Sequence, residues 1–104
     1  VPALLIPCCA ARPDTPGLPQ GVVASIYGSI LPAVWSFMLA ARERGIGTCW
    51  TSLHLSFEKE IGALLQIPDE CAQVALIPIA YTKGTDFKVA PRKDLDSVLH
   101  TNSW

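Results

Sequence analysis

A long stretch without a charged residue, from Thr15 to Ala41, limits most strongly how this chain can fold. Only 16% of the 104 residues are charged, and a run this apolar has to be covered by other protein or by lipid. A membrane span needs about 20 consecutive apolar residues. Prolines, glycines and serines interrupt this stretch along its whole length, as at Pro16, Pro19 and Pro32. We therefore predict a helix that protein buries on nearly every side, with a membrane span as the less favoured alternative.

The best-defined part of this helix is predicted to begin near Pro32, because proline is tolerated in a first helical turn. Ser25 or Ser29 can cap it from upstream. Gly45 is expected to end the helix, after basic residues in the last turn that suit the helix dipole. Apolar residues repeat at a spacing of three to four, which is typical of a helix: Leu31, Val34, Met38 and Ala41.

Three apolar runs predict strands. Residues 1–10 suit a strand buried on both faces, although Pro7 places it at a strand end or a sheet edge. Residues 46–52 predict a short strand that leads into a loop. Residues 74–81 predict a central strand, in which Pro78 is a local violation of strand rules.

A second helix is predicted between the last two of these strands, with Ser56 as its N-cap and Pro68 closing it. Residues 12–21, rich in proline and glycine, are expected to be a loop, and the chain from Thr82 onward a polar, extended tail. The second helix is expected to bury an apolar face and expose a charged one; the apolar residues are Phe57, Ile61, Leu64 and Leu65, and the charged ones Glu58, Lys59 and Glu60.

The alternation of helices and strands predicts an α/β or α+β fold with a sheet covered by helices. The length allows one domain at most, and a sheet of two or three strands is too small to be complete when both faces are covered. The mean hydropathy of +0.34 is high for a small soluble protein. We therefore expect a part of a larger unit, or a chain that hides apolar surface against another. The net charge of −1 argues against nucleic acid as a partner.

The four cysteines are Cys8, Cys9, Cys49 and Cys71. No Cys-x-x-Cys pair and no paired Cys/His spacing occurs, so a zinc site is not expected. We predict four buried, reduced thiols in a cytosolic protein, with two disulfides as the less favoured alternative. No leader sequence is expected, because the chain opens at Val1 without a charged segment.

Few residues suggest chemistry by themselves. Residues 45–47 lack the third glycine of a dinucleotide loop, and the order of Ser52, His54 and Asp69 does not mark a nucleophile elbow. The basic pair at 92–93 is either solvated or able to bind a phosphate through its arginine. The residues alone therefore indicate a fragment of an α/β domain able to bind a flat, anionic ligand.

Several segments in register resemble the nitroreductase family of FMN-dependent oxidoreductases. They are residues 33–51, 67–69, 74–81, 91–95 and 98–100, in the order the family has them. The resemblance covers essentially the whole chain, but it matches only the C-terminal half of the family's domain. It implies a nitroreductase-like α+β fold, with a mixed sheet covered by helices, of which residues 1–104 are the C-terminal portion. The N-terminal segment that grips the FMN phosphate is absent from this sequence.

The resemblance also implies cofactor-binding residues. Thr51, Ser52 and Leu53 resemble the loop whose backbone N–H faces N5 of the flavin ring, where no special side chain is needed. Arg92 matches the C-terminal basic residue that contacts the FMN phosphate, with Lys93 as the reserve. No catalytic side chain and no metal ligand is implied.

The activity implied by the resemblance is hydride transfer from NAD(P)H to FMN, and then electron transfer to a nitroaromatic, a quinone or a related acceptor. The resemblance further implies an intertwined homodimer, in which the partner chain would bury the apolar helix. The protein is expected in the cytoplasm, without a membrane. The alternative is a truncated relative that keeps the dimer fold without flavin and acts as a structural or interaction module.

Overall fold

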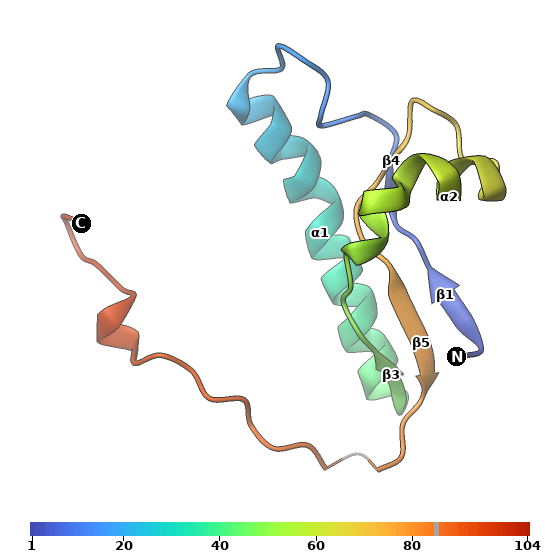
Figure 1. Ribbon diagram of the computed structural model, residues 1–104. Helices are drawn as coiled ribbons and strands as arrows, with labels where there is room; N and C mark the ends of the chain where they lie inside the picture. Colours follow the sequence, from blue (N-terminus) through green and yellow to red (C-terminus); the bar gives the residue numbers. More distant parts are fainter. Residues whose placement is uncertain (85) are drawn as a thin grey trace.

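The sheet is built around one central strand. The computed structural model describes residues 1–84 and 86–104. In it, β5 (Ile77–Tyr81) lies between β1 (Ala3–Leu5) and β3 (Ile46–Thr48), and both pairings are antiparallel (Figure 1). The prediction of a central strand is confirmed, although β5 begins three residues later than expected. The α+β class is confirmed as well.

Pro78 fits into the central strand because its missing N–H faces a gap. Leu76 exchanges two backbone hydrogen bonds with Thr51, at 3.0 and 2.8 Å. Alternate residues of an antiparallel strand face the same neighbour, so Pro78 also faces the side of β3. β3 ends at Thr48, and Cys49 and Trp50 belong to no strand there. The proline therefore separates β3 from the bridge at Thr51 and opens a notch in the sheet edge.

The predicted strand over residues 1–10 is divided into two. It is interrupted at Ile6 and Pro7, after which β2 (Cys8–Cys9) pairs with β4 (Ala72–Gln73) in a separate ribbon. The expectation of a strand end or sheet edge at Pro7 is confirmed, because β1 is an edge strand that stops before it. Burial on both faces is wrong: Leu5 packs on the core beside Val34 of α1, whereas Leu4, on the opposite face of the strand, is 61% exposed.

The long helix α1 (Gln20–Glu43) begins well before the predicted position. Pro32 lies inside the helix, and Pro19 precedes it as the N-cap. Ser25 and Ser29 cap nothing, because their hydroxyls donate to carbonyls within the helix at 2.8 Å. The predicted end is confirmed: Gly45 has φ +73°, which favours glycine.

The structure contradicts the prediction that α1 is buried on nearly every side. Val34 and Ala41 are buried, whereas Trp35 and Leu39 on the outer side are 56% and 55% exposed. One side of the helix packs on the strands, and the other stays largely exposed. By length and composition alone, this largely exposed helix of 24 residues could cross a membrane.

The second helix, α2 (Glu58–Leu65), agrees with the predicted faces at Ile61, which is half-buried, and at Lys59 and Glu60, which are exposed, but it departs from them elsewhere. It follows a 3-10 turn, η1 (Leu53–Phe57), and Phe57 rather than Ser56 is its N-cap. Leu64 is 80% exposed, whereas Glu58 is half-buried and points toward the β2–β4 ribbon. The cause is an ion pair with a distant arginine, described below.

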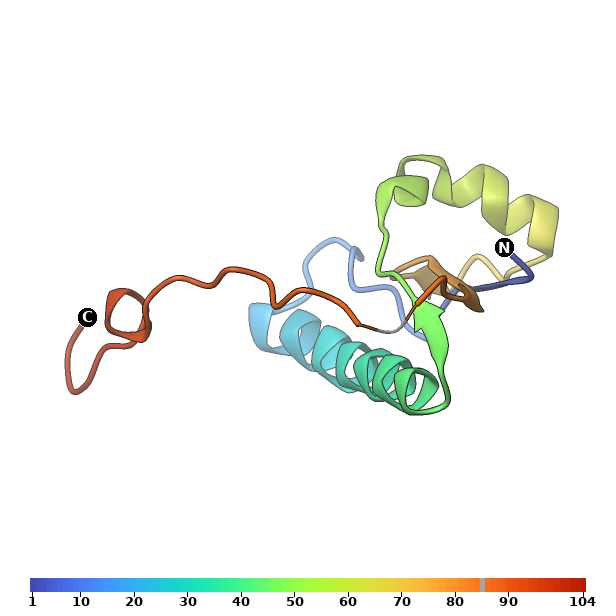
Figure 2. The same cartoon turned by 90° about the horizontal axis from the view of Figure 1, so that it is seen from below.

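The core lies between α1 and the strands. Ala75 and Ile77 are fully buried, and Ile30 of α1 joins the two apolar clusters that make up the core. Figure 2 shows the sheet with α1 on one face and α2 on the other. Of the four cysteines, Cys9 is buried, whereas Cys49 is exposed, so the prediction of four buried thiols is wrong; all four are free.

The chain after β5 forms an arm that leaves the folded body (Figure 1). This C-terminal arm, residues 82–104, is exposed at every described position and contains one short 3-10 turn, η2 (Leu95–Ser97). The predicted extended tail is confirmed there, and Thr85 lies outside the described residues. The radius of gyration is 17.0 Å, whereas a compact chain of this length has about 13 Å.

Candidate functional site

A cavity of about 870 Å³ lies where β3, the C-terminal half of α1 and the C-terminal arm meet. We call it the β3 cavity. Pro78 and Cys49, which lie on the two sides of the notch in the sheet edge, both belong to the lining of this cavity. Its lining comprises Trp35, Arg42, Ile46, Gly47, Thr48, Cys49, Pro78, Ala80, Thr82, Phe87 and Arg92.

Gly47 keeps β3 close to the neighbouring chain at the base of this cavity. A Cβ atom there would clash with the Thr82 methyl group and lie 3.2 Å from the Ala80 carbonyl oxygen. Both of those residues also line the cavity. A side chain at position 47 would therefore force the Thr82 methyl group aside and crowd the Ala80 carbonyl, which would change the shape of the cavity.

Two arginines and two aromatic rings surround the β3 cavity. The Arg42 guanidinium lies 4.8 Å from the centre of the Phe87 ring, which holds the arm against the end of α1. Arg92 follows on the arm, and Trp35 lies one to two turns before Arg42 on α1. Positive charge beside aromatic faces suits a ligand that is both flat and anionic.

The loop predicted to face a flavin lies beside the cavity lining. Thr51 is bound to Leu76 by both backbone groups, and its hydroxyl donates to the same Leu76 carbonyl at 2.7 Å. Ser52 precedes η1 and is exposed, and Leu53 is 87% exposed. Among the described residues, no acceptor is found for the backbone N–H of Ser52 or of Leu53.

The two basic residues predicted from the arm differ in position. Arg92 lines the β3 cavity, together with Thr48 and Cys49 that lead into the loop; Lys93 is exposed and outside the lining. Sequence reasoning missed Trp35, Arg42 and Phe87. A signal existed for Arg42, because residues 42–44 are the first charged residues after a long uncharged stretch. The helix dipole alone is enough to explain basic residues there, so the sequence did not point to a binding role.

The residues considered for a nucleophile do not form a triad. Both ring nitrogens of His54 are buried without a hydrogen-bond partner in the described part of the chain, so neither Ser52 nor Asp69 is bonded to it. Asp69 lies instead at a second cavity, of about 860 Å³. In residues 1–84 and 86–104, no group of three potential ligands could hold a metal ion.

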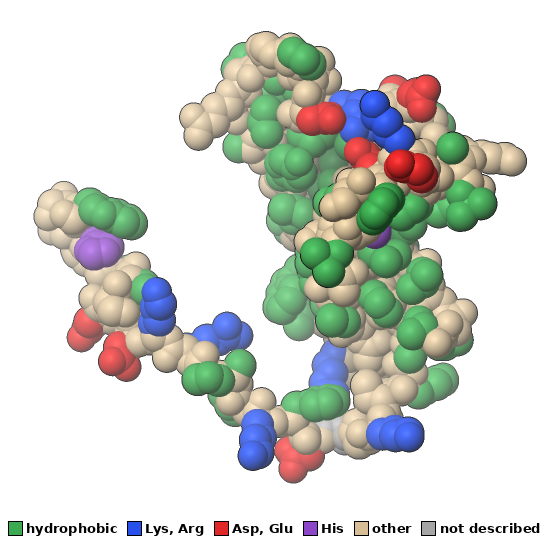
Figure 3. Space-filling model, viewed as in Figure 1, with side chains coloured by type: hydrophobic (Ala, Val, Ile, Leu, Met, Phe, Trp, Pro, Cys, Tyr) green, Lys and Arg blue, Asp and Glu red, His purple; other side chains and the backbone are tan. Residues whose placement is uncertain are grey.

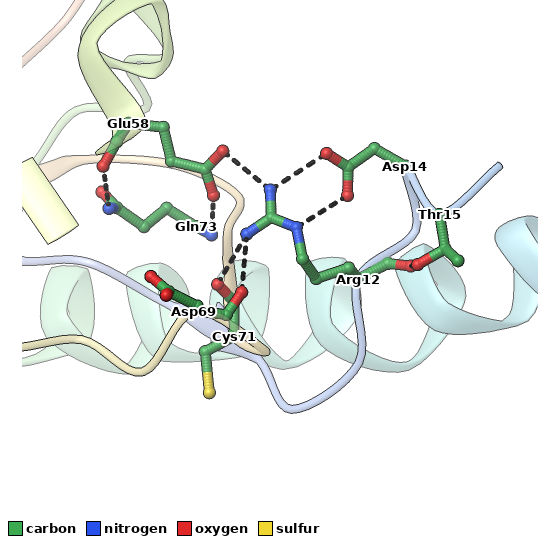
Figure 4. A network of polar contacts seen from close by, with 7 residues as sticks. All are labelled: Arg12, Asp14, Thr15, Glu58, Asp69, Cys71 and Gln73. Atoms are coloured by element: carbon green, nitrogen blue, oxygen red, sulfur yellow. Dashed lines mark hydrogen bonds and ion pairs between the residues drawn. The ribbon is translucent and has the colours of Figure 1, made fainter. Parts of the chain in front are cut away.

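That second cavity contains a polar network around Arg12, shown in Figure 4. Nε and Nη2 of Arg12 donate to the two Asp14 oxygens at 3.0 Å, and Nη2 also donates to Glu58 at 3.0 Å. Nη1 donates to the carbonyl oxygens of Asp69, at 3.4 Å, and Cys71, at 2.9 Å. We call this network the Arg12 corner.

Charge within the Arg12 corner is balanced. The hydrogen bonds from Arg12 hold the pKa of Glu58, and that of Asp14, below their ordinary values, and the two carboxylates raise the pKa of the guanidinium. A guanidinium has five N–H groups, and five hydrogen bonds are present. Arg12 therefore ties the loop, α2 and the turn before β4 together, and has no donor left for a ligand.

Comparison with known proteins identifies the family. The model of the nitroreductase family matches residues 22–81, which run from α1 through β3 and α2 to the end of β5. No curated protein matches the chain. The match covers more than half of the 104 residues, so the chain belongs to the nitroreductase family, a family of oxidoreductases. The resemblance stated from the sequence is thereby confirmed.

Proposed function

We propose that this member of the nitroreductase family is the C-terminal portion of an FMN-dependent oxidoreductase that carries electrons from NAD(P)H to a small acceptor such as a nitroaromatic or a quinone. The observation that carries the proposal is the β3 cavity. It combines two guanidinium groups, two aromatic rings and the entrance to the Thr51–Leu53 loop within the matched region and the adjoining arm.

The residues of the β3 cavity fit the two ends of such a cofactor. Arg92, with Arg42 beside it, provides positive charge for a phosphate, and Trp35 and Phe87 provide apolar faces for a ring. When bound, FMN supplies the hydride chemistry. The N–H of Thr51 is already bonded to Leu76, so we assign the contact with the flavin N5 edge to the N–H of Ser52 or Leu53.

The chain's own part in the reaction is to bind and orient. No buried acid or base lies in the β3 cavity, whose titratable side chains are two arginines and the exposed thiol of Cys49. Protons can reach the open cavity from solvent. Arg92 acts as an anchor for charge, and the backbone of the loop sets the distance to the ring.

We also propose that the working form is a homodimer in the cytoplasm. The outer side of α1 and the C-terminal arm both expose apolar side chains, among them Leu39, Phe87, Val89 and Trp104. Figure 3 shows hydrophobic side chains at the surface over α1 and along the arm. An apolar surface of this extent is typical of an interface between chains. Free thiols fit a reducing compartment.

The test measures flavin binding by the protein from its complete reading frame and by the 104-residue chain. We expect a visible flavin absorbance band that survives gel filtration for the complete protein. Arg92→Ala should weaken FMN binding about 10-fold, by loss of a charge-assisted contact. Lys59→Ala, on α2 and away from the β3 cavity, is the control and should leave affinity unchanged.

Two results would contradict the proposal. A complete protein that stays colourless and gains no band with added FMN would favour the interaction module. Equal FMN affinity of the wild type and Arg92→Ala would reject the phosphate contact even if flavin binds. Lys93→Ala separates the two basic residues, and we expect a smaller loss than for Arg92→Ala, since Lys93 lies outside the cavity lining.

A further inference from the structure

Three of the four free cysteines gather at the β2–β4 ribbon. Cys8 and Cys9 form β2, and Cys71 directly precedes β4. Cys8 lies opposite Gln73, and Cys9 opposite Ala72. Side chains alternate between the two faces of a strand. Cys8, Gln73 and Cys71 therefore belong to one face of the ribbon, and Cys9 belongs to the other.

Other contacts agree with this placement. Gln73 is bonded to Glu58 of α2 by its backbone N–H, at 2.9 Å, and by its side-chain amide, at 3.0 Å, so its face looks toward α2. Cys71 lines the same cavity as Glu58. Burial raises the pKa of the Cys8 thiol, and Cys71, Cys9 and Glu58 raise it further. Cys9 is only 7% exposed, within the apolar cluster packed on α1.

We propose that Cys8 and Cys71 form a reversible disulfide on exposure to hydrogen peroxide. The Cys71 thiolate attacks one peroxide oxygen; the O–O bond breaks, giving a sulfenic acid on Cys71 and, with a proton, one water. The Cys8 sulfur then attacks the sulfenic sulfur, the S–S bond forms and a second water leaves. Two thiols lose two electrons, and the peroxide is reduced to two waters.

The bond requires a movement at Cys71, and this movement links it to the Arg12 corner. Diagonal neighbours in a regular ladder have Cβ atoms up to about 7 Å apart, whereas a disulfide holds them at about 3.8 Å. Cys71 lies outside β4, and its carbonyl accepts the 2.9 Å hydrogen bond from Arg12. Closing the disulfide replaces that contact by a covalent tie between the same two segments.

The first test identifies the bond. The 104-residue chain is treated with limiting hydrogen peroxide, its thiols are counted after denaturation, and its disulfide peptides are mapped. We expect two of the four thiols to disappear, one linkage between Cys8 and Cys71, and full recovery with dithiothreitol. Cys8→Ser and Cys71→Ser should abolish this linkage, whereas Cys9→Ser and Cys49→Ser should keep it. A linkage of Cys9 to Cys71, a bond between chains, or four intact thiols would overturn the proposal.

The second test measures the coupling to Arg12. Arg12→Ala should lower the urea midpoint of the reduced chain strongly, and of the oxidised chain less, because the disulfide takes over the tie at Cys71 but not the ion pair with Glu58. The same comparison in the Cys8→Ser background should show no difference between peroxide-treated and reduced protein. If Arg12→Ala lowers the urea midpoint equally in the reduced and the oxidised chain, the disulfide does not take over the contact between Arg12 and the Cys71 carbonyl, and the proposed coupling is wrong. If Arg12→Ala does not fold, the peptide map of the wild type alone decides.

Discussion

The Arg12 corner and the outer side of α1 differ in how far their side chains find partners within the chain. At the corner, five donors of one guanidinium find five acceptors supplied by residues that lie far apart in the chain. On the outer side of α1, apolar side chains such as Trp35 and Leu39 stay more than half exposed. Figure 3 shows both: charged side chains gathered near β4, and hydrophobic ones along α1.

The difference separates interactions that the single chain satisfies by itself from apolar surface that another molecule has to cover. A saturated, partly buried ion-pair network needs no second molecule, whereas a helix side of this apolarity is stable in water only when something covers it. The corner should therefore govern the stability of the single chain, and the outer side of α1 its assembly. The following variants test this separation, in order of expected effect.

Leu39→Asp should affect assembly most. It places a charge on the outer side of α1, and a symmetric dimer would bury it twice. We expect about 4 kcal/mol less association free energy, or about a 1,000-fold higher dimer dissociation constant. Sedimentation equilibrium in plain buffer measures it.

Gln20→Asp puts the same charge on the exposed first turn of α1 and should leave the dimer intact. A wild-type chain that is monomeric at high concentration would contradict the assignment of this side to a second copy. A chain found only in the membrane fraction, and released by detergent alone, would identify lipid as its cover instead.

Arg12→Ala should affect the fold of the single chain, measured under reducing conditions. It leaves half-buried Glu58 without its charged partner and removes the donors to the carbonyls of Asp69 and Cys71. We expect a loss of about 2–3 kcal/mol in the free energy of unfolding by urea.

Arg44→Ala serves as the matched control, because its 3.6 Å ion pair with Glu43 is exposed. Its cost should stay below about 0.5 kcal/mol. A similar loss in the free energy of unfolding for Arg12→Ala and Arg44→Ala would show that the Arg12 corner stabilises the chain no more than an exposed ion pair does.

The smallest effect concerns acid. The pKa of Glu58 is lowered from its ordinary 4.5 in the folded chain, first by the hydrogen bond from Arg12. Stability from this group is therefore fully present above pH 4.5 and is lost as the pH falls through the lower folded value. Asp14, lowered from 3.8, acts in the same direction.

We expect the wild type to lose about 1 kcal/mol more than Glu58→Gln between pH 6 and pH 3, measured by urea unfolding at each pH. The variant lacks the titrating carboxylate at position 58 and therefore serves as the reference for the wild type. A parallel decline of the two proteins would place the acid sensitivity elsewhere in the chain.

Local patterns in the sequence predicted the elements that depend on local chemistry. The spacing of Val34, Met38 and Ala41 predicted a helix, and Gly45 marked its end correctly; these three residues lie on the side of α1 that packs on the strands. The start of α1 was missed, because the glycines and serines before Pro32 lower helix propensity, whereas packing of Ile26 and Ile30 on the β2–β4 ribbon favours helix there.

Contacts between distant residues could not be predicted in this way. Glu58 appeared to belong to a solvated face, since its partner Arg12 lies 46 positions away in a proline-rich loop. Arg92, which the family resemblance implied as a phosphate contact, lines the β3 cavity, and its role there stays a prediction. The contact of Phe87 with Arg42 was not expected, because it depends on where the arm passes the end of α1.

The short edge strand β1 has a consequence for aggregation. An exposed strand edge offers unpaired backbone groups to other chains and can seed fibres. Here the edge strand has three residues and lies between Pro2 and Pro7, neither of which can donate to an added strand. Growth by strand addition is therefore limited at this edge of the sheet, and contacts that another chain makes there should depend on side chains rather than on backbone pairing.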